Sequence, residues 1–339
     1  MLRARLVAAI AASACAAGCA SNPGSHDGPQ SAWQLGPAMP RRALDPGVAM
    51  LGQELVVAGG FDTGAAEGLD ITARVDAFDV TKGTWRAMPD APVAWTHGNL
   101  ATVGDALYLV GGLEGAERVA RGEGFALDPG SGRWEPIAAM EAGDERGAAG
   151  VITAPGHIYV LGGASTTAAL ASCLDYNTVT GSWTHLPDLP APRAQPAVMR
   201  RSDGTLIVTG GFESLDASAP RGEVWALPPP GATLRTWQPR TAMHQPADLD
   251  LRGGCAYGVI LGQLVCAGGE AGASARSVVE TYDPYRDVWM ASEPMPAPRA
   301  GSRGAASGGR LYVPGGAGDL ALEPTDTLYI YAPLDTAPR

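Results

Sequence analysis

A short apolar run ending in two adjacent glycines occurs six times in the sequence, and this repetition constrains the fold more than any other feature. The six runs are Leu55–Gly60, Leu107–Gly112, Ile158–Gly163, Leu206–Gly211, Leu264–Gly269 and Leu311–Gly316. The first glycines of successive pairs lie 52, 51, 48, 58 and 47 residues apart. A period in this range is typical of stacked supersecondary units that share one continuous core. The spacing therefore predicts six structural repeats in one domain.

Aromatic and turn-forming residues recur in phase with the glycine pairs. A tryptophan follows each of the first five pairs after 20 to 26 residues, at Trp85, Trp134, Trp183, Trp237 and Trp289. Four of these tryptophans have an Asp or Asn six residues earlier, at Asp79, Asp128, Asn177 and Asp283. An Asp or Asn after a strand favours a turn because its side chain can bond the backbone two residues on. A tryptophan on an outer strand can fill the gap between neighbouring sheets.

This arrangement resembles the kelch repeat, whose signature is Gly-Gly, then Tyr-Asp, then Trp. The resemblance covers roughly residues 31–332. It implies an all-β fold, a six-bladed kelch-type β-propeller in which each blade has four antiparallel strands around a central channel. The fourth repeat departs from the pattern, because Val224–Leu227 is followed by three prolines. We expect its third strand to end at those prolines and its outer edge to be irregular.

The sixth repeat lacks a tryptophan of its own, and Trp33 near the N-terminus can supply it. We therefore expect residues 31–36 to pair with residues 326–331 as the outermost strand of the last blade. This N-terminal strand would close the ring and leave no unprotected sheet edge there.

The N-terminus has the features of an export signal. Residues 1–19 combine a basic start with an apolar run too short to cross a bilayer. Ala16–Cys19 resembles a lipobox, which predicts lipidation of Cys19 in an outer-membrane or periplasmic lipoprotein. Ordinary cleavage after Ala14–Ala16, giving a soluble periplasmic or secreted protein, is the alternative. Residues 20–30 read as a flexible tether and 31–339 as the propeller.

Charge and composition narrow the possible partners. The formal net charge is −11, and no basic stripe is present, so we expect no nucleic-acid partner. Contact with a membrane is expected only through the N-terminal lipid anchor. We expect a monomer without cofactors, whose ligand is an unknown protein or glycan.

Three cysteines lie in the predicted propeller, and we expect no disulfide between them. Cys266 occupies a core position that the other five repeats fill with Val or Leu, and Cys173 aligns with valines of other repeats. A two-residue turn at Leu261–Gly262 would place Cys255 and Cys266 diagonally, about 7 Å apart. A shift of one turn residue could bring them opposite each other.

An arginine recurs in the loop that leads into the first strand of the repeats. The predicted ligand-binding residues are Arg42, Arg146, Arg193, Arg252 and Arg299, together with Trp95, which takes this position in the second blade, and His97. In kelch propellers these loops lie on the usual binding face. A ring of guanidinium groups could grip an anionic ligand. The alternative is structural, because arginine at this point belongs to the repeat and often ties down adjacent loops.

Other polar residues indicate no established chemistry. Among the five histidines, His97 and His244 fall in entering loops, whereas His157 and His185 do not, and His26 precedes the propeller. Two are too few for a metal site, and we expect none. The copper ligands of galactose oxidase, which shares the fold, have no counterparts. Entering loops also contain Asp45, Asp144, Glu145, Asp248 and Asp250, which could act as acid and base on a sugar or pair with the arginines.

Two functional classes remain open. The first is a non-catalytic binding or scaffold module in the cell envelope. The second is a sugar-modifying enzyme at the channel mouth, such as a periplasmic sialic-acid-type mutarotase or epimerase. A deep polar mouth with shifted carboxylate or histidine pKa values would favour the enzyme.

Overall fold

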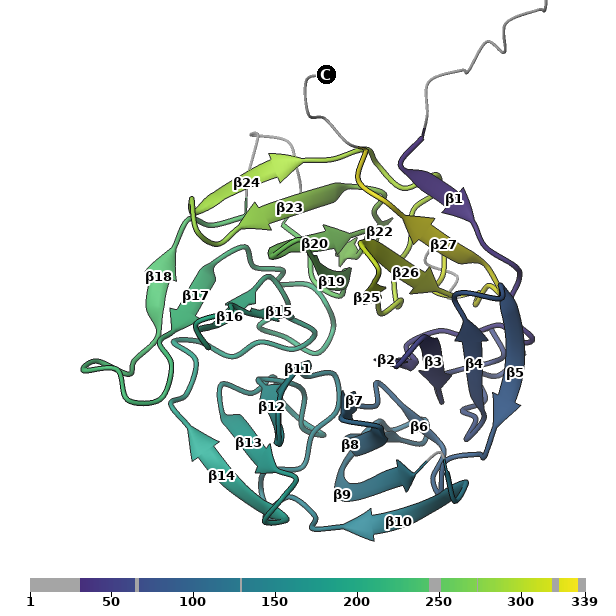
Figure 1. Cartoon of the computed structure of the whole chain (residues 1–339), viewed down its shortest axis with the longest axis horizontal. Coiled ribbons are helices and arrows are strands. Elements are labelled where there is room, and N and C mark those ends of the chain that lie inside the picture. The colour runs from purple at the N-terminus through teal and green to yellow at the C-terminus, as the bar shows by residue number, and fades with distance from the viewer. Residues whose placement is uncertain are drawn as a thin grey trace, which may run out of the picture. The chain divides into compact units, whose positions relative to one another are not determined.

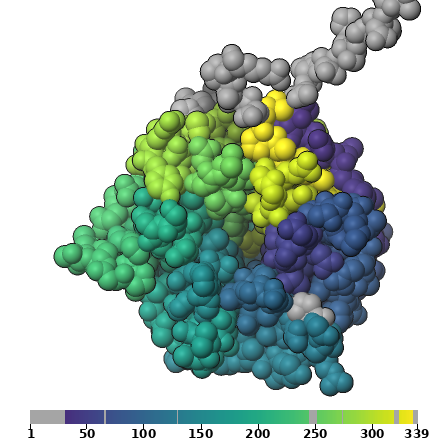
Figure 2. All heavy atoms as spheres, in the orientation of Figure 1, coloured from purple at the N-terminus to yellow at the C-terminus, as the bar shows by residue number. Residues whose placement is uncertain are grey.

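The computed structural model describes residues 31–64, 67–128, 130–243, 251–272, 274–318 and 323–334. These residues contain strands and turns, arranged as six antiparallel sheets around one axis (Figure 1). Figure 2 shows the blades surrounding a recess at the centre of the ring. The predicted signal, Cys19 and the tether at 20–30 lie outside the described residues, as do 335–339. Within the described ranges, no helix is long and apolar enough to cross a membrane.

Each blade has its first strand at the channel and its last strand at the periphery. Blade one contains β2 (Gly47–Leu51), β3 (Glu54–Ala58), β4 (Val75–Asp79) and β5 (Thr84–Met88). Blade two contains β7 (Leu100–Val103), β8 (Ala106–Glu114), β9 (Val119–Asp128) and β10 (Arg133–Ile137), with β6 (Trp95–Thr96) also paired to β8. Blade three contains β11 (Gly150–Ala154), β12 (His157–Leu161), β13 (Cys173–Asn177) and β14 (Ser182–Leu186).

The other three blades repeat this order. Blade four contains β15 (Ala197–Arg200), β16 (Leu206–Thr209), β17 (Val224–Leu227) and β18 (Gln238–Arg240). Blade five contains β19 (Ala256–Ile260), β20 (Gln263–Ala267), β23 (Val279–Asp283) and β24 (Val288–Ala291), with a small hairpin of β21 (Glu270–Ala271) and β22 (Ser274–Ala275). Blade six contains β25 (Ala305–Ser307), β26 (Arg310–Pro314), β27 (Leu328–Tyr331) and β1 (Trp33–Leu35).

The N-terminal strand closes the ring as predicted. Strand β1 pairs antiparallel with β27, with Trp33 opposite Tyr331 and Leu35 opposite Tyr329. Trp33 is buried, and its ring centroid lies 5.0 Å from that of Tyr331. The first and last parts of the propeller thus share one sheet.

The glycine pairs mark the points where neighbouring blades touch. The first glycine of each pair has a positive φ, and a Cβ at that position would lie 2.3–3.2 Å from a backbone carbonyl oxygen in the next blade's entering loop. These carbonyls belong to Trp95, Arg146, Arg193, Arg252, Arg299 and, at the closure, Ala43. In four blades the second glycine donates its N–H to the same carbonyl, at 2.7–2.9 Å. Glycine is required here by both the backbone conformation and the close approach.

The outer tryptophans join successive blades at the periphery. Each indole Nε1–H donates to a backbone carbonyl in the segment that follows the preceding blade's last strand, at 2.8–3.1 Å. The six tryptophans are Trp33, Trp85, Trp134, Trp183, Trp237 and Trp289. The predicted packing role is therefore combined with a hydrogen bond between blades.

The predicted turns and the irregular fourth blade are confirmed. The side chains of Asp79, Asp128, Asn177 and Asp283 each accept backbone N–H groups two or three residues ahead. In blade four, β17 ends at Leu227, directly before the prolines, and the outer strand β18 has three residues.

The expectation of no disulfide is wrong, because Cys255 and Cys266 are bonded and their Cα atoms lie 5.6 Å apart. The predicted register holds, since Tyr257 pairs with Cys266. However, Cys255 precedes β19, between Gly254 with a φ of 65° and the first strand residue. The chain leaves regular strand geometry there, so the diagonal pair comes within the usual Cα range of a disulfide. Cys173 is the free, buried cysteine among the described residues.

Reduction of this disulfide is expected to lower the free energy of unfolding by about 3 kcal/mol, the loop-closure value for a ring of this size. Thermal unfolding of the full chain with and without reductant measures the effect. A Cys255→Ala/Cys266→Ala variant is the control, since reductant should not change its melting temperature. A reductant effect of equal size in both proteins would contradict the assignment.

Candidate functional site

The upper face is the face that carries the entering loops and the loops after Gly-Gly. At its centre, one residue from each blade has a φ of 50° to 65° at an equivalent position: Asp45, His97, Ala148, Gln195, Gly254 and Gly301. Five of them donate a backbone N–H to the carbonyl of a neighbour in this set, at 2.7–3.1 Å. We call these six residues the mouth ring. Their bonds run from blade to blade around the axis and fix the positions of the side chains at the channel mouth.

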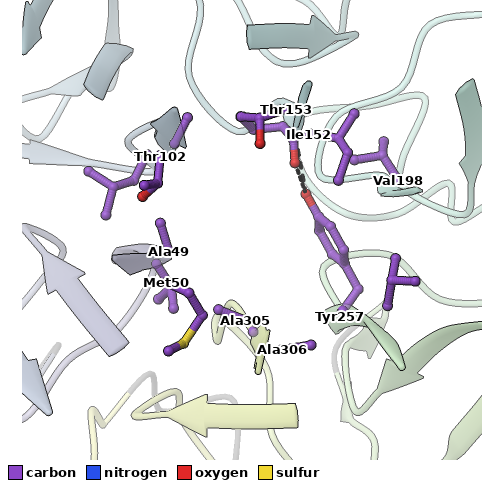
Figure 3. Close-up of a pocket in the computed structure, with 16 residues that line it drawn as sticks. Ala49, Met50, Thr102, Ile152, Thr153, Val198, Tyr257, Ala305 and Ala306 are labelled. Atoms are coloured by element: carbon purple, nitrogen blue, oxygen red, sulfur yellow. Dashed lines mark hydrogen bonds between the residues drawn. The ribbon is translucent and has the colours of Figure 1, made fainter. Parts of the chain in front are cut away.

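Two side chains cross the channel below the mouth ring. The hydroxyl group of Tyr257 in β19 accepts a hydrogen bond from the backbone N–H of Val151 in β11, at 3.1 Å. Arg303 donates to the carbonyl of Ala149, at 3.3 Å. Figure 3 shows Tyr257 extending along one side of the open channel, next to Val198, with its hydroxyl hydrogen bond to β11 dashed. Burial raises the pKa of Tyr257, and Arg303 opposes this shift.

A cavity of about 270 Å³ surrounds this crossing (Figure 3). It is lined by residues of the first strand of every blade, mostly aliphatic, including Ala49, Ile152, Val198 and Ala305. The apolar lining offers few convergent polar side chains, so the polar chemistry of the channel lies at the mouth.

A hollow of about 190 Å³ lies on the upper face beside the mouth ring. Its lining includes Asp45, His97, Arg118, Gln195, Leu215 and Glu270. We call it the upper hollow. Its lining comes from the entering loops of blades one, two, four and six and from the loops after Gly-Gly of blades two, four and five. Acidic, basic, amide and imidazole groups thus converge on one space, which is the usual anatomy of a binding site.

Burial shifts the pKa values of two groups in the upper hollow. Burial lowers the pKa of His97 to about 4, against the opposing charge of Asp45, so the imidazole is neutral at pH 7. Its Nε2 lies 3.3 Å from Asp45 Oδ1 and 3.5 Å from Gln195 Nε2. Burial, and secondarily the charge of Asp45, raises the pKa of Glu270 to about 7. The mouth therefore contains one carboxyl group that changes charge near neutral pH.

Four of the five predicted arginines are buried inside the blades. Arg146 donates to the carbonyls of Gly162 and Ser172, at 3.1 and 2.8 Å. Arg252 forms an ion pair with Glu280 at 2.5 Å, where both side chains are at most 3% exposed. These contacts lie within the protein, as the structural alternative requires.

The other two buried arginines stack on aromatic rings. Arg193 lies 4.4 Å from the ring centroid of Trp225 and pairs with Glu213 and Glu223. Arg299 lies 4.9 Å from the ring centroid of Tyr329. Burial lowers the pKa of both guanidinium groups, and Glu223 opposes the shift most strongly at Arg193.

Blade one uses a different arginine from the one selected by spacing. Arg42 is partly exposed and pairs with Glu67 at 2.6 Å. Arg41 is buried instead, donating to Asp76 at 2.9 Å and to the carbonyl of Gly59 at 2.9 Å. Ala43 holds the backbone position that contacts the glycine pair, so Arg42 lies one residue and Arg41 two residues before the position that arginine holds in the other blades. Trp95 takes this position in blade two, and its side chain is buried in the core.

The structure separates the remaining candidates. His97 and Asp45 meet in the upper hollow, whereas Asp144 pairs with Arg146 and His185, and Glu145 accepts the N–H of Gly143. His157 pairs with Asp175 at 2.9 Å, away from the mouth. His26, His244, Asp248 and Asp250 lie outside the described residues. Across the described ranges, no group of three His, Cys, Asp or Glu side chains could hold a metal ion.

Several residues of the mouth and channel were not selected from the sequence, namely Arg118, Gln195, Tyr257, Glu270 and Arg303. Glu270 directly follows a glycine pair, and Gln195 lies two residues after Arg193. These two positions, directly after Gly-Gly and two residues after the recurring arginine, lie at the upper face in the other blades too. Either position could therefore have identified its residue from the sequence.

Comparison with known proteins identifies similar repeats. Residues 42–92 match the family model of the Kelch motif. The chain is 29% identical over 282 residues to Kelch-like protein terF of Aspergillus terreus, covering 79% of this chain and 60% of that protein. It is 29% identical over 118 residues to human Kelch repeat and BTB domain-containing protein 13, covering 34% of this chain and 25% of that protein.

A solved structure shares the fold. The structure of YjhT superposes with a TM-score of 0.74 at 14% identity, covering 89% of this chain and 98% of that one. The chain spans 60% or less of the length of each curated relative it matches.

Proposed function

This chain is a kelch-repeat β-propeller, and from that premise we propose that it is an exported binding or scaffold module that holds a protein ligand at its upper hollow. The observation that carries the proposal is the convergence of polar side chains from several blades on this hollow. Kelch domains generally mediate contacts between proteins. The hollow lies where loops that differ from blade to blade meet a ring of backbone hydrogen bonds, an arrangement suited to selective binding.

Two features support export to the cell envelope. The N-terminal residues have a basic start, an apolar run and a lipobox-like segment ending at Cys19. The disulfide between Cys255 and Cys266 suits an oxidising compartment. We propose a lipid-anchored location for the full chain, with the propeller as its ligand-binding part.

The test compares two exposed leucines on opposite faces. Leu215 is 40% exposed and lines the upper hollow, whereas Leu261 is 93% exposed in the turn between β19 and β20 on the other face. We expect Leu215→Arg to reduce capture of envelope proteins by the full chain at least tenfold, as measured by quantitative mass spectrometry. Leu261→Arg is the matched control and should capture the same proteins as the wild type. Equal capture by Leu215→Arg and the wild type would overturn the proposal.

The raised pKa of Glu270 favours one second candidate, a sugar-modifying enzyme of the isomerase or mutarotase type. A carboxyl group that titrates near neutral pH is suited to both accepting and donating a proton. In that case Glu270 would move the proton at the mouth while neutral His97 and Gln195 orient the sugar by hydrogen bonds. A ligand bound by the wild type but chemically changed only when Glu270 is intact would distinguish this candidate from simple binding.

A further inference from the structure

The upper hollow has unpaired charges of opposite sign among its lining residues. Glu270 belongs to the hairpin after Gly-Gly in blade five, and Arg118 belongs to the corresponding loop of blade two. Among the residues that the structure describes, neither side chain has a hydrogen-bond or ion-pair partner. The lining holds two further carboxylates. Asp45 lies 3.3 Å from the neutral imidazole of His97, and Asp216 accepts hydrogen bonds from the backbone N–H and hydroxyl of Ser218. The hollow therefore presents charged groups of both signs, and Glu270 and Arg118 are available to pair with charges of a ligand.

An apolar lobe adjoins these charges. A second hollow of about 50 Å³ shares His97, Arg118, Gln195 and Leu215 with the upper hollow. Its other lining residues are five apolar ones, Leu113, Ala148, Ala164, Ala194 and Phe212, and three small polar ones, Ser165, Thr166 and Ser214. Apolar groups here can take a small aliphatic side chain out of water.

We propose that the upper hollow binds a zwitterionic α-amino acid or short peptide with an aliphatic side chain. The ligand's ammonium group lies toward Glu270 and Asp45, its carboxylate toward Arg118, and its side chain in the apolar lobe. A ligand with a single charge would leave one of the protein's charges without a partner, at a cost in affinity. The volumes of about 190 and 50 Å³ suit a ligand of this size. This inference rests on the proposed function and narrows its ligand to peptide-type molecules.

The test uses four small ligands that differ in one charge each. Calorimetric titration of the full chain at low salt compares L-leucine, L-leucyl-glycine, N-acetyl-L-leucine and L-leucinamide. We expect a zwitterion to bind at least tenfold more tightly than either capped leucine, because each cap removes one charged hydrogen bond. The order of leucine and leucyl-glycine distinguishes a free amino acid from a peptide as the preferred ligand.

Two variants assign the ends of the ligand. Glu270→Gln should lower the affinity for leucine and leucinamide at least fivefold, while the affinity for N-acetyl-leucine should stay unchanged. Arg118→Gln should lower the affinity for leucine and N-acetyl-leucine, which carry a carboxylate, but not the affinity for leucinamide. Glu135→Gln and Arg133→Gln are matched controls, because both residues are exposed on the outer strand β10, and they should change no affinity.

Equal binding of capped and uncapped leucine, or binding of none of the four ligands, would overturn the inference. If none binds but Leu215→Arg still abolishes protein capture, the ligand class is wrong and the proposed function stands. If zwitterions bind but Leu215→Arg captures as much protein as the wild type, the inference stands and the protein-binding function does not.

Discussion

Replacing Trp33 with alanine is expected to lower the free energy of unfolding by about 3–5 kcal/mol, the usual cost of truncating a buried tryptophan. Trp33 is 5% exposed and packs against Tyr329 and Tyr331. Its indole also donates a hydrogen bond to the carbonyl of Glu293 in the segment that follows blade five, at 3.0 Å. The residue thus lies where the two ends of the propeller meet, and equilibrium chemical denaturation measures the loss.

Leu35 provides the matched control for this prediction. It lies on the same three-residue strand, opposite Tyr329, but is 73% exposed. Leu35→Ala should change the free energy of unfolding by less than about 0.5 kcal/mol, as surface substitutions do. If both variants lost equally little free energy of unfolding, strand β1 would not be closing the ring in solution.

Replacing Arg252 with alanine is expected to cost about 3–5 kcal/mol, because it leaves the carboxylate of Glu280 buried without its partner. The two side chains are 2% and 3% exposed and lie 2.5 Å apart. Arg252 also donates to the carbonyl of Cys266 at 3.4 Å, which ties the entering loop to the second strand of its blade. Denaturant titration of the variant measures the loss.

Arg42 is the control, since the sequence placed it in the same ring of arginines. Its side chain is 39% exposed and pairs with the exposed Glu67, so Arg42→Ala should cost about 1 kcal/mol or less. The pair of variants also tests the anionic-ligand prediction for the arginine ring. A stable Arg252→Ala protein that had lost affinity for an acidic sugar would favour a ligand role over the structural one.

Much of the fold could be predicted because its contacts repeat. The glycine pairs, the turn residues and the outer tryptophans each recur near a fifty-residue period, and each makes the same contact in successive blades. A repeated pattern reveals a repeated environment, so the core position of Cys266 and the closing role of Trp33 followed from alignment of the repeats alone.

The candidate site could be predicted only in part, because its residues do not repeat. The mouth ring places Asp45, His97, Ala148, Gln195, Gly254 and Gly301 at one equivalent backbone position with six different environments. Of these, Asp45 and His97 were among the residues selected from the sequence. Glu270 holds the position after Gly-Gly that apolar residues occupy in the other blades, whereas Arg118 reaches the same hollow from a loop whose length and direction no periodicity specifies.

The sequence by itself determined the number of blades, the strand order and the closure of the ring, since these depend on local propensity and on contacts shared by all repeats. The tertiary structure decided which arginine of blade one is buried, that Cys255 reaches Cys266, and which charges meet at the mouth. Those outcomes depend on displacements of one residue or a few ångströms at irregular loop positions. Such displacements depend on how neighbouring blades pack against each other, and the sequence pattern of a single repeat does not specify that packing.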